Sequence, residues 1–98
     1  MGNAPEPPKG LSVEAAGLWR TYTSNWELDE HSLVVLTVAL ETFDRMRQAQ
    51  AAIKKHGLVT KTGRLNPASY VERDCRRDLV KSLRSLGLVL DPGKDPRA

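Results

Sequence analysis

The feature that most constrains this chain is the stretch from Asp29 to Lys55, which contains neither glycine nor proline. Glycine and proline are the residues that interrupt helices most strongly, so this stretch predicts one continuous helix. Asp29 is a suitable N-cap, and Gly57 can adopt the positive φ that ends many helices. At 1.5 Å per residue the helix has a length of about 40 Å. A chain of 98 residues holds a single domain, so we expect this helix to be its central element.

The two halves of this helix differ in how their apolar residues are distributed. The first half carries apolar side chains around most of its circumference, whereas the second half has only one apolar stripe. A helix that is apolar on several sides must be buried on several sides. Because only two further helices are available to cover it, we expect part of the first half to contact a second copy of the chain. The predicted interface residues are Leu33, Val34, Leu36, Leu40 and Phe43.

Two shorter helices flank the central one. Ser12 is the expected cap of the first helix, whose apolar residues recur at helical spacing. Asn66 and Pro67 open the last helix, because asparagine caps helices and proline at the first position loses no hydrogen bond. Gly87 is expected to end it. The predicted buried faces are Ala15, Leu18, Trp19, Tyr22 and Trp26 in the first helix, and Val71, Cys75, Leu79, Leu83 and Leu86 in the last.

The connection between the central and last helices predicts a short β-hairpin. Two β-compatible runs, residues 58–60 and 64–65, flank a turn in which Gly63 supplies a positive φ. The expected fold is therefore all-α: a three-helix core with one long central helix and a short β-hairpin between the second and third helices.

The chain is expected to form one helical oligomerising domain over residues 11–90. Residues 1–10 hold three of the six prolines and residues 91–98 hold two more, so both ends are expected to be flexible tails. No apolar run approaches the roughly 18 residues that a membrane span needs, and the first residues lack the apolar segment of a signal peptide. The single cysteine excludes an intramolecular disulfide. We therefore expect a soluble intracellular protein with no membrane partner.

No combination of residues in the sequence predicts catalysis. A glycine-rich phosphate loop and the GxSxG, CxxC and HExxH motifs are all missing. Asp29, Glu30 and His31 are consecutive on a helix, so their side chains diverge and do not converge on a metal ion. His56 fits a residue at a helix C-terminus, and Cys75 on an apolar face fits a small hydrophobe. The chain is therefore predicted not to be an enzyme and to need no cofactor and no metal.

The charge of the chain is distributed unevenly. Residues 1–44 hold two basic and seven acidic residues, a net charge of −5, whereas residues 45–98 hold thirteen basic and five acidic residues, a net charge of +8. From Arg45 to Arg64 there are six basic side chains and no acidic one, so this stretch offers no repulsion to a polyanion. The basic residues of the last helix alternate with acids, which fits a salt-bridged solvated face equally well. The predicted DNA-binding residues are Arg45, Arg47, Lys54, Lys55, Lys61, Arg64, Arg73, Arg77 and Lys81.

Several short motifs follow one another in a recognisable order between about residues 8 and 92. They are Leu18-Trp19-Arg20, Leu28-Asp29, Gly57 followed by a basic turn with Gly63, Asn66-Pro67-Ala68, and Leu86-Gly87-Leu88. In this order they resemble the small subunits of tailed-phage terminases, the non-catalytic partners in viral genome packaging. The resemblance implies a homo-oligomeric ring in the host cell cytoplasm. It also implies that the ring binds double-stranded viral DNA at the packaging site and regulates the ATPase and nuclease of the terminase large subunit.

The residues alone leave two other functions open. A free-standing DNA-binding regulator explains the basic segment and predicts a dimer with a short recognition helix after a tight turn. The connection of about nine residues from Gly57 to Leu65 is longer than such a turn. A protein-interaction adaptor explains the excess of apolar surface and predicts no affinity for DNA at low salt.

Overall fold

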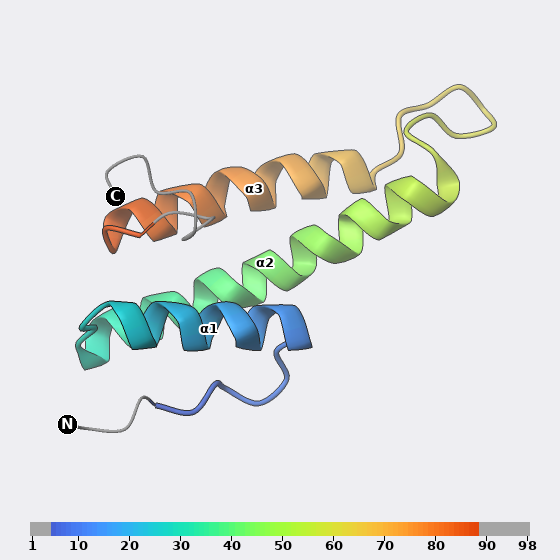
Figure 1. The fold of residues 1–98 in the computed structure, drawn as a ribbon. Helices are drawn as coiled ribbons and strands as arrows, with labels where there is room; N and C mark the ends of the chain where they lie inside the picture. Colours follow the sequence, from blue (N-terminus) through green and yellow to red (C-terminus); the bar gives the residue numbers. More distant parts are fainter. Residues whose placement is uncertain (1–4, 89–98) are drawn as a thin grey trace.

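The computed structural model describes residues 5–88 and contains three helices. They are α1 (Val13–Asn25), α2 (Glu30–His56) and α3 (Ala68–Ser85). The long helix α2 is central: α3 runs back along it, and α1 packs against its N-terminal half (Figure 1). The molecule measures 57 × 30 × 22 Å. The all-α class with a long central helix is therefore confirmed, and three helices meet at only one end of an elongated molecule.

The predicted starts of α1 and α2 are confirmed by side-chain caps. The Ser12 hydroxyl accepts a hydrogen bond from the Ala15 N–H at 3.0 Å, and the Asp29 carboxylate accepts one from the Ser32 N–H at 2.7 Å. The hydrogen bonds from Ser32 lower the pKa of the Asp29 carboxyl below its ordinary value. Gly57 ends α2 with a φ of 85°, a conformation that side chains with a Cβ rarely adopt.

Asn66 opens α3 and also fastens it to α2. Its side-chain oxygen accepts a hydrogen bond from the Ala68 N–H at 3.0 Å, and its amide nitrogen donates to the Gly57 carbonyl at 2.9 Å. Pro67 already has helical dihedral angles. The buried Asn66 side chain is thus satisfied by two backbone partners, and it fixes the start of α3 against the end of α2.

The end of α3 is a Schellman motif, as Gly87 predicts. Gly87 has a φ of 75°, and the Leu88 N–H donates to the Leu83 carbonyl at 2.8 Å. This turn brings Leu88 back over the last turn of the helix, where its side chain is buried in the core.

The hydrophobic core lies mainly at the end where three helices meet. The predicted face of α1 is confirmed, with Leu18 and Trp26 packed at its edge, and so is most of the predicted face of α3. Val71 is an exception and is 41% exposed. It lies towards the end of the molecule where α2 has no buried residue after Ala49. The core consists of Ala15, Trp19, Tyr22, Leu36, Ala39, Leu40, Phe43, Met46, Cys75, Leu79, Leu83 and Leu88.

The opposite end of the molecule has almost no core. It is formed by the last turn of α2, the connection and the first turn of α3, and we call residues 54–71 the tip. Within the described part of the chain, Asn66 is the only buried residue between Gln50 and Asp74. Five large apolar side chains of the tip are instead exposed: Leu58, Val59, Leu65, Tyr70 and Val71.

The prediction of a β-hairpin in the connection is wrong, because residues 5–88 contain no β-strand. Val59 and Leu65 form one isolated antiparallel bridge, flanked by two backbone hydrogen bonds of 2.7 Å. The two arms are too short to extend the pairing, since α2 ends just before them and Pro67 has no N–H to donate. Gly63 does supply the predicted positive φ, at 81°.

The predicted N-terminal tail contacts the domain from residue 5 onwards. Residues 5–10 lie along α1 (Figure 1), where the indole N–H of Trp19 donates to the Pro5 carbonyl at 2.8 Å. The first four residues and the predicted C-terminal tail, residues 91–98, lie outside the described residues.

Candidate nucleic-acid interface

The outer face of α3 carries a shallow groove with cationic walls. Its lining residues recur at intervals of three or four along the helix, so one helical face presents all of them. The groove has a volume of about 560 Å³, and among the described residues its only uncharged lining side chain is Val80. We call this site the α3 groove; its five cationic residues, all exposed, are Arg73, Arg76, Arg77, Lys81 and Arg84.

Exposed carboxylates of the same helix neutralise part of the α3 groove. Asp74 forms ion pairs with Arg73 at 3.3 Å and with Arg77 at 3.6 Å, and Asp78 lies 3.7 Å from Arg77. Exposed pairs of this kind contribute roughly 0–1 kcal/mol, so a phosphate can replace such a carboxylate at small cost. Two cations of the groove, Lys81 and Arg84, form no ion pair with any described residue.

Glu72 directly precedes the groove-lining residues in the sequence and connects α3 to α2. Its carboxylate accepts hydrogen bonds from Arg76, one helical turn later, and from the Gln50 amide of α2 at 2.7 Å. The Arg76 guanidinium and, to a smaller extent, the Gln50 amide lower the pKa of the Glu72 carboxyl. The same hydrogen bond raises the pKa of Arg76. Arg76 is therefore held by a structural contact, unlike the two unpaired cations of the groove.

The tip is a second basic surface. Lys54, Lys55, Lys61 and Arg64 are all exposed, and none forms an ion pair with a described residue. Residues 45–71 contain no carboxylate at all. Four positive charges at the tip are therefore uncompensated within the described chain.

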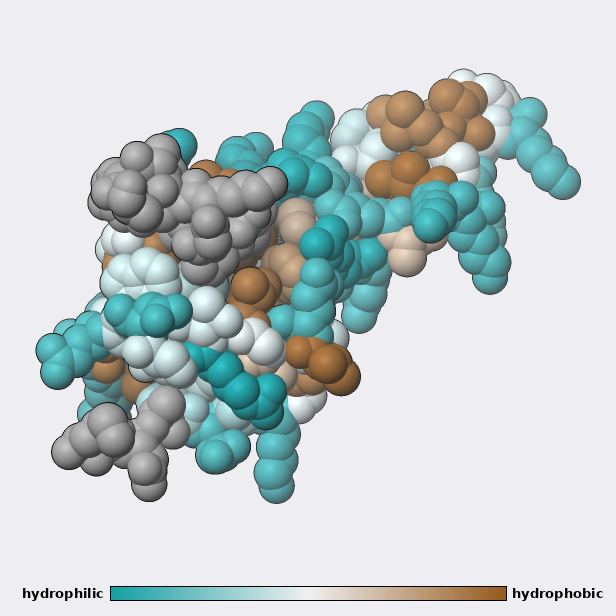
Figure 2. Space-filling model, in the orientation of Figure 1, coloured by the Kyte–Doolittle hydropathy of each residue, from teal (hydrophilic) through white to brown (hydrophobic). Residues whose placement is uncertain are grey.

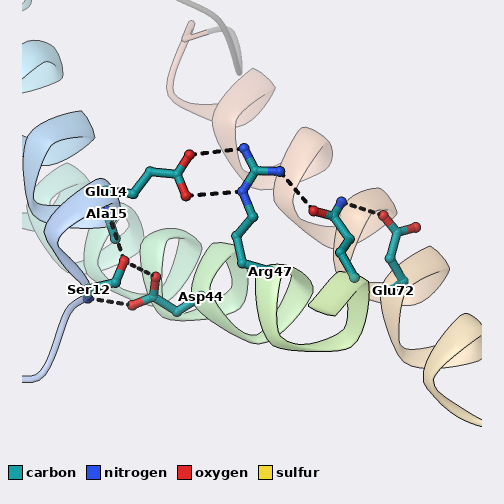
Figure 3. A network of polar contacts seen from close by, with 7 residues as sticks. Ser12, Glu14, Ala15, Asp44, Arg47 and Glu72 are labelled. Atoms are coloured by element: carbon teal, nitrogen blue, oxygen red, sulfur yellow. Dashed lines mark hydrogen bonds and ion pairs between the residues drawn. The ribbon is translucent and has the colours of Figure 1, made fainter. Parts of the chain in front are cut away.

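Arg45 and Arg47 lie in the second half of α2, before the tip, and they differ in their partners. Arg47 contacts both carboxylate oxygens of Glu14 in α1, at 3.1 and 3.0 Å (Figure 3). Its guanidinium also lies 5.0 Å from the centre of the Phe43 ring. The lack of acidic residues within residues 45–64 therefore does not leave Arg47 unpaired, because its partner comes from another helix. Arg45 is exposed and forms no ion pair with a described residue.

The pairing of Arg47 belongs to a polar network that joins all three helices (Figure 3). Asp44 of α2 accepts hydrogen bonds from the Ser12 N–H, at 2.9 Å, and from the Ser12 hydroxyl. Arg47 donates to Gln50 at 2.8 Å, and Gln50 donates in turn to Glu72 of α3. This network fastens α1 and α3 to α2, so Arg47 serves the fold.

The predicted oligomer-interface residues fall into two groups. Leu36, Leu40 and Phe43 are buried between the helices of one chain, which leaves them almost no surface for a second copy. Leu33 packs partly against the same core. Val34, in contrast, is 60% exposed. Sequence reasoning missed Val38, which is 55% exposed and lies one turn later on the same face of α2.

The described residues contain no group of three His, Cys, Asp or Glu side chains placed to share a metal ion. Cys75 lies in the core, where burial raises the pKa of its thiol, so the thiol is protonated at neutral pH. None of the helices in residues 5–88 combines the length and the apolar character needed to cross a membrane.

Comparison with known proteins adds no relative: no protein-family model, curated protein or solved structure matches this chain. Its function is therefore argued from the exposed surfaces of the three-helix fold. Those surfaces are the α3 groove, the basic tip and the exposed valines of α2.

Proposed function

We propose that this chain is a small terminase subunit, a non-catalytic protein of viral genome packaging. In this proposal it assembles into a homo-oligomeric ring, binds double-stranded viral DNA at the packaging site, and regulates the ATPase and nuclease of the large subunit. The observation that carries the DNA-binding part is the presence of cations with no carboxylate partner, four at the tip and two in the α3 groove. The ring and the large subunit as partners rest on the motif order that resembles the terminase family.

The α3 groove suits contact with a phosphate backbone. Its cations extend from Arg73 to Arg84, a distance of about 16 Å along the helix axis, so several phosphates of one strand lie within reach. Contacts of this kind hold DNA in place without reading its sequence. In a ring the groove is repeated once per copy, so modest affinities combine and binding becomes steeply dependent on salt. Sequence preference would then come from how easily the DNA bends around the assembly.

Two alternatives differ from this proposal in what they predict. A free-standing regulator needs a short recognition helix after a tight turn, whereas α3 has 18 residues and follows an eleven-residue connection, residues 57–67. An adaptor is favoured by one observation, the exposed apolar side chains of the tip. It predicts no DNA binding even at low salt, which separates it from the terminase proposal.

The decisive experiment reverses the unpaired charges of the groove. Lys81→Glu with Arg84→Glu is compared with Lys9→Glu and Arg20→Glu, which change the net charge equally at exposed positions near α1. Binding to double-stranded DNA is measured by fluorescence anisotropy across a range of salt concentrations. We expect the groove variant to bind at least about tenfold more weakly, with a salt slope smaller by about 2, because two phosphate contacts are lost. Equal losses in both variants would contradict a defined DNA site on α3.

The tip cations are tested separately with Lys54→Glu and Lys55→Glu. These residues end α2, and no described carboxylate pairs with them. We expect weaker DNA binding and an unchanged mass in solution. Unchanged DNA affinity would remove these two lysines from the DNA site.

A further inference from the structure

The tip exposes apolar side chains that no described part of the chain covers. Leu58, Val59 and Leu65 are 53%, 56% and 41% exposed, and we call these three residues the tip patch. Val59 and Leu65 are the non-hydrogen-bonded pair of the antiparallel bridge, so their side chains lie close together on one side of the connection. Figure 2 shows this apolar surface bordered by hydrophilic side chains. Exposed apolar surface with a charged border is typical of a protein contact.

A second uncovered apolar surface lies on the first half of α2. Glu30, Val34, Val38 and Glu41 recur at intervals of three or four, so they share one helical face, and all four are exposed. We call these four residues the α2 outer face. A hollow of about 230 Å³ adjoins it, bordered by Val38, Glu41, Thr42 and Arg45. This face therefore presents two valines between two carboxylates, with space beside them for an inserted side chain.

The charges around these two surfaces are opposite, apart from Arg45 at the border of the hollow. Residues 21–44 contain five acidic residues and no lysine or arginine, whereas residues 45–71 contain six lysines and arginines and no acidic residue. The helix α2 separates the two surfaces, because Val34 lies 22 residues, or about 33 Å, before its end at His56. The tip patch therefore has no access to the α2 outer face of its own chain. Its complement in both apolar character and charge is the α2 outer face of another copy.

We infer that the tip patch of one chain packs on the α2 outer face of a second copy, with Lys61 and Arg64 facing Glu30 and Glu41. The two surfaces are different, so the contact is heterologous and each added copy still offers one free surface of each kind. Such a contact produces a ring when the rotation between copies closes, and an open chain when it does not. The inference deepens the proposed function, on which it rests for closure into a ring. It assigns Lys61 and Arg64, two of the four unpaired tip cations, to the contact between copies, so DNA binding in the assembly rests on the α3 groove and on Lys54 and Lys55.

The test uses two variants, each of which removes one of the two surfaces. The tip variant carries Val59→Ser and Leu65→Ser, and the face variant carries Val34→Ser and Val38→Ser. Circular dichroism checks that both stay folded, since all four positions are exposed. A matched control, Val13→Ser, removes an apolar side chain that is 92% exposed on α1. The mass of each protein is measured by light scattering behind a sizing column.

We expect each variant alone to have the mass of one chain, and the control to have the mass of the wild-type oligomer. An equimolar mixture of the two variants should form a two-chain species and nothing larger, because only one intact contact can form between them. Suppose that the wild type is an oligomer. The inferred contact is then wrong if the mixture keeps the mass of one chain or if either variant alone reaches the wild-type mass, while the proposed ring remains. If the wild type itself has the mass of one chain, both the contact and the ring are wrong, and the DNA-binding experiment decides what remains of the proposed function.

Discussion

The two ends of this molecule are stabilised in different ways. Where three helices meet, side chains of α1, α2 and α3 bury one another, and Tyr22, Leu36 and Leu79 are fully enclosed. At the tip, the described chain buries only Asn66, and the structure is maintained by hydrogen bonds of its side chain and one β-bridge. Few buried apolar contacts imply a low free energy of local opening. One end therefore supplies the stability of the fold, and the other end leaves its apolar and basic side chains available to other molecules.

The largest effect that tests this difference comes from truncating one leucine at each end. Leu36→Ala empties part of the core and should lower the free energy of unfolding by about 2–5 kcal/mol. Leu58→Ala removes the same atoms from a half-exposed side chain of the tip and should cost less than about 1 kcal/mol. Chemical denaturation measured at a concentration where both variants are single chains checks both values. Similar losses at the two positions would show that the tip is part of the stabilising core.

An intermediate effect is expected where α1 joins α2. Asp44→Ala removes the carboxylate that accepts two hydrogen bonds from Ser12, and it should destabilise the protein by about 1–2 kcal/mol. Hydrogen exchange should quicken in α1 more than in α3, because the lost contact fastens α1 alone. Asp78→Ala is the matched control, since its carboxylate makes only one long exposed ion pair. A loss in Asp78→Ala as large as that in Asp44→Ala would contradict a specific role for the Ser12 contact.

The smallest effect concerns Glu72, which connects α3 to α2 next to the tip. The lowered pKa of Glu72 means that the folded state binds a proton less readily than the unfolded state. The Glu72 carboxylate therefore stabilises the fold above its ordinary pKa of about 4.3, and this contribution is lost as the pH falls through the lowered pKa. Glu72→Gln should therefore cost about 0.5 kcal/mol at pH 7 and less near pH 3. Denaturation curves of wild type and variant at the two pH values measure this difference. A loss of the same size at both pH values would show that the charge of Glu72 does not stabilise the fold.

The sequence predicts those parts of the fold that depend on neighbouring residues. Ser12, Asp29, Asn66 and Gly87 fulfil their predicted roles because a cap bonds to backbone groups only two to five residues away. The β-hairpin was wrong for an equally local reason, since Pro67 leaves the second arm too short to pair further.

The sequence pattern does not predict contacts between residues that are far apart in the sequence. Glu14 and Arg47 are 33 positions apart, and nothing in their local sequence indicates that α1 would bring them together. For the same reason, the apolar pattern of α2 identified a helix buried on several sides but did not separate Leu36, which faces its own core, from the exposed Val34. The candidate basic residues were recognisable from charge alone, whereas their division between the tip, the α3 groove and the structural network required the packed structure.

The proposed assembly joins copies of this chain through the tip, the end without a core, and binds DNA. Its most direct test is the absolute mass of the wild-type chain, measured by light scattering at about 50 mM and about 500 mM salt, because the proposed contact combines apolar packing with exposed ion pairs that salt weakens. We expect one defined species of more than two chains at low salt, with smaller species appearing at high salt. A mass of one or two chains at both salt concentrations would contradict it.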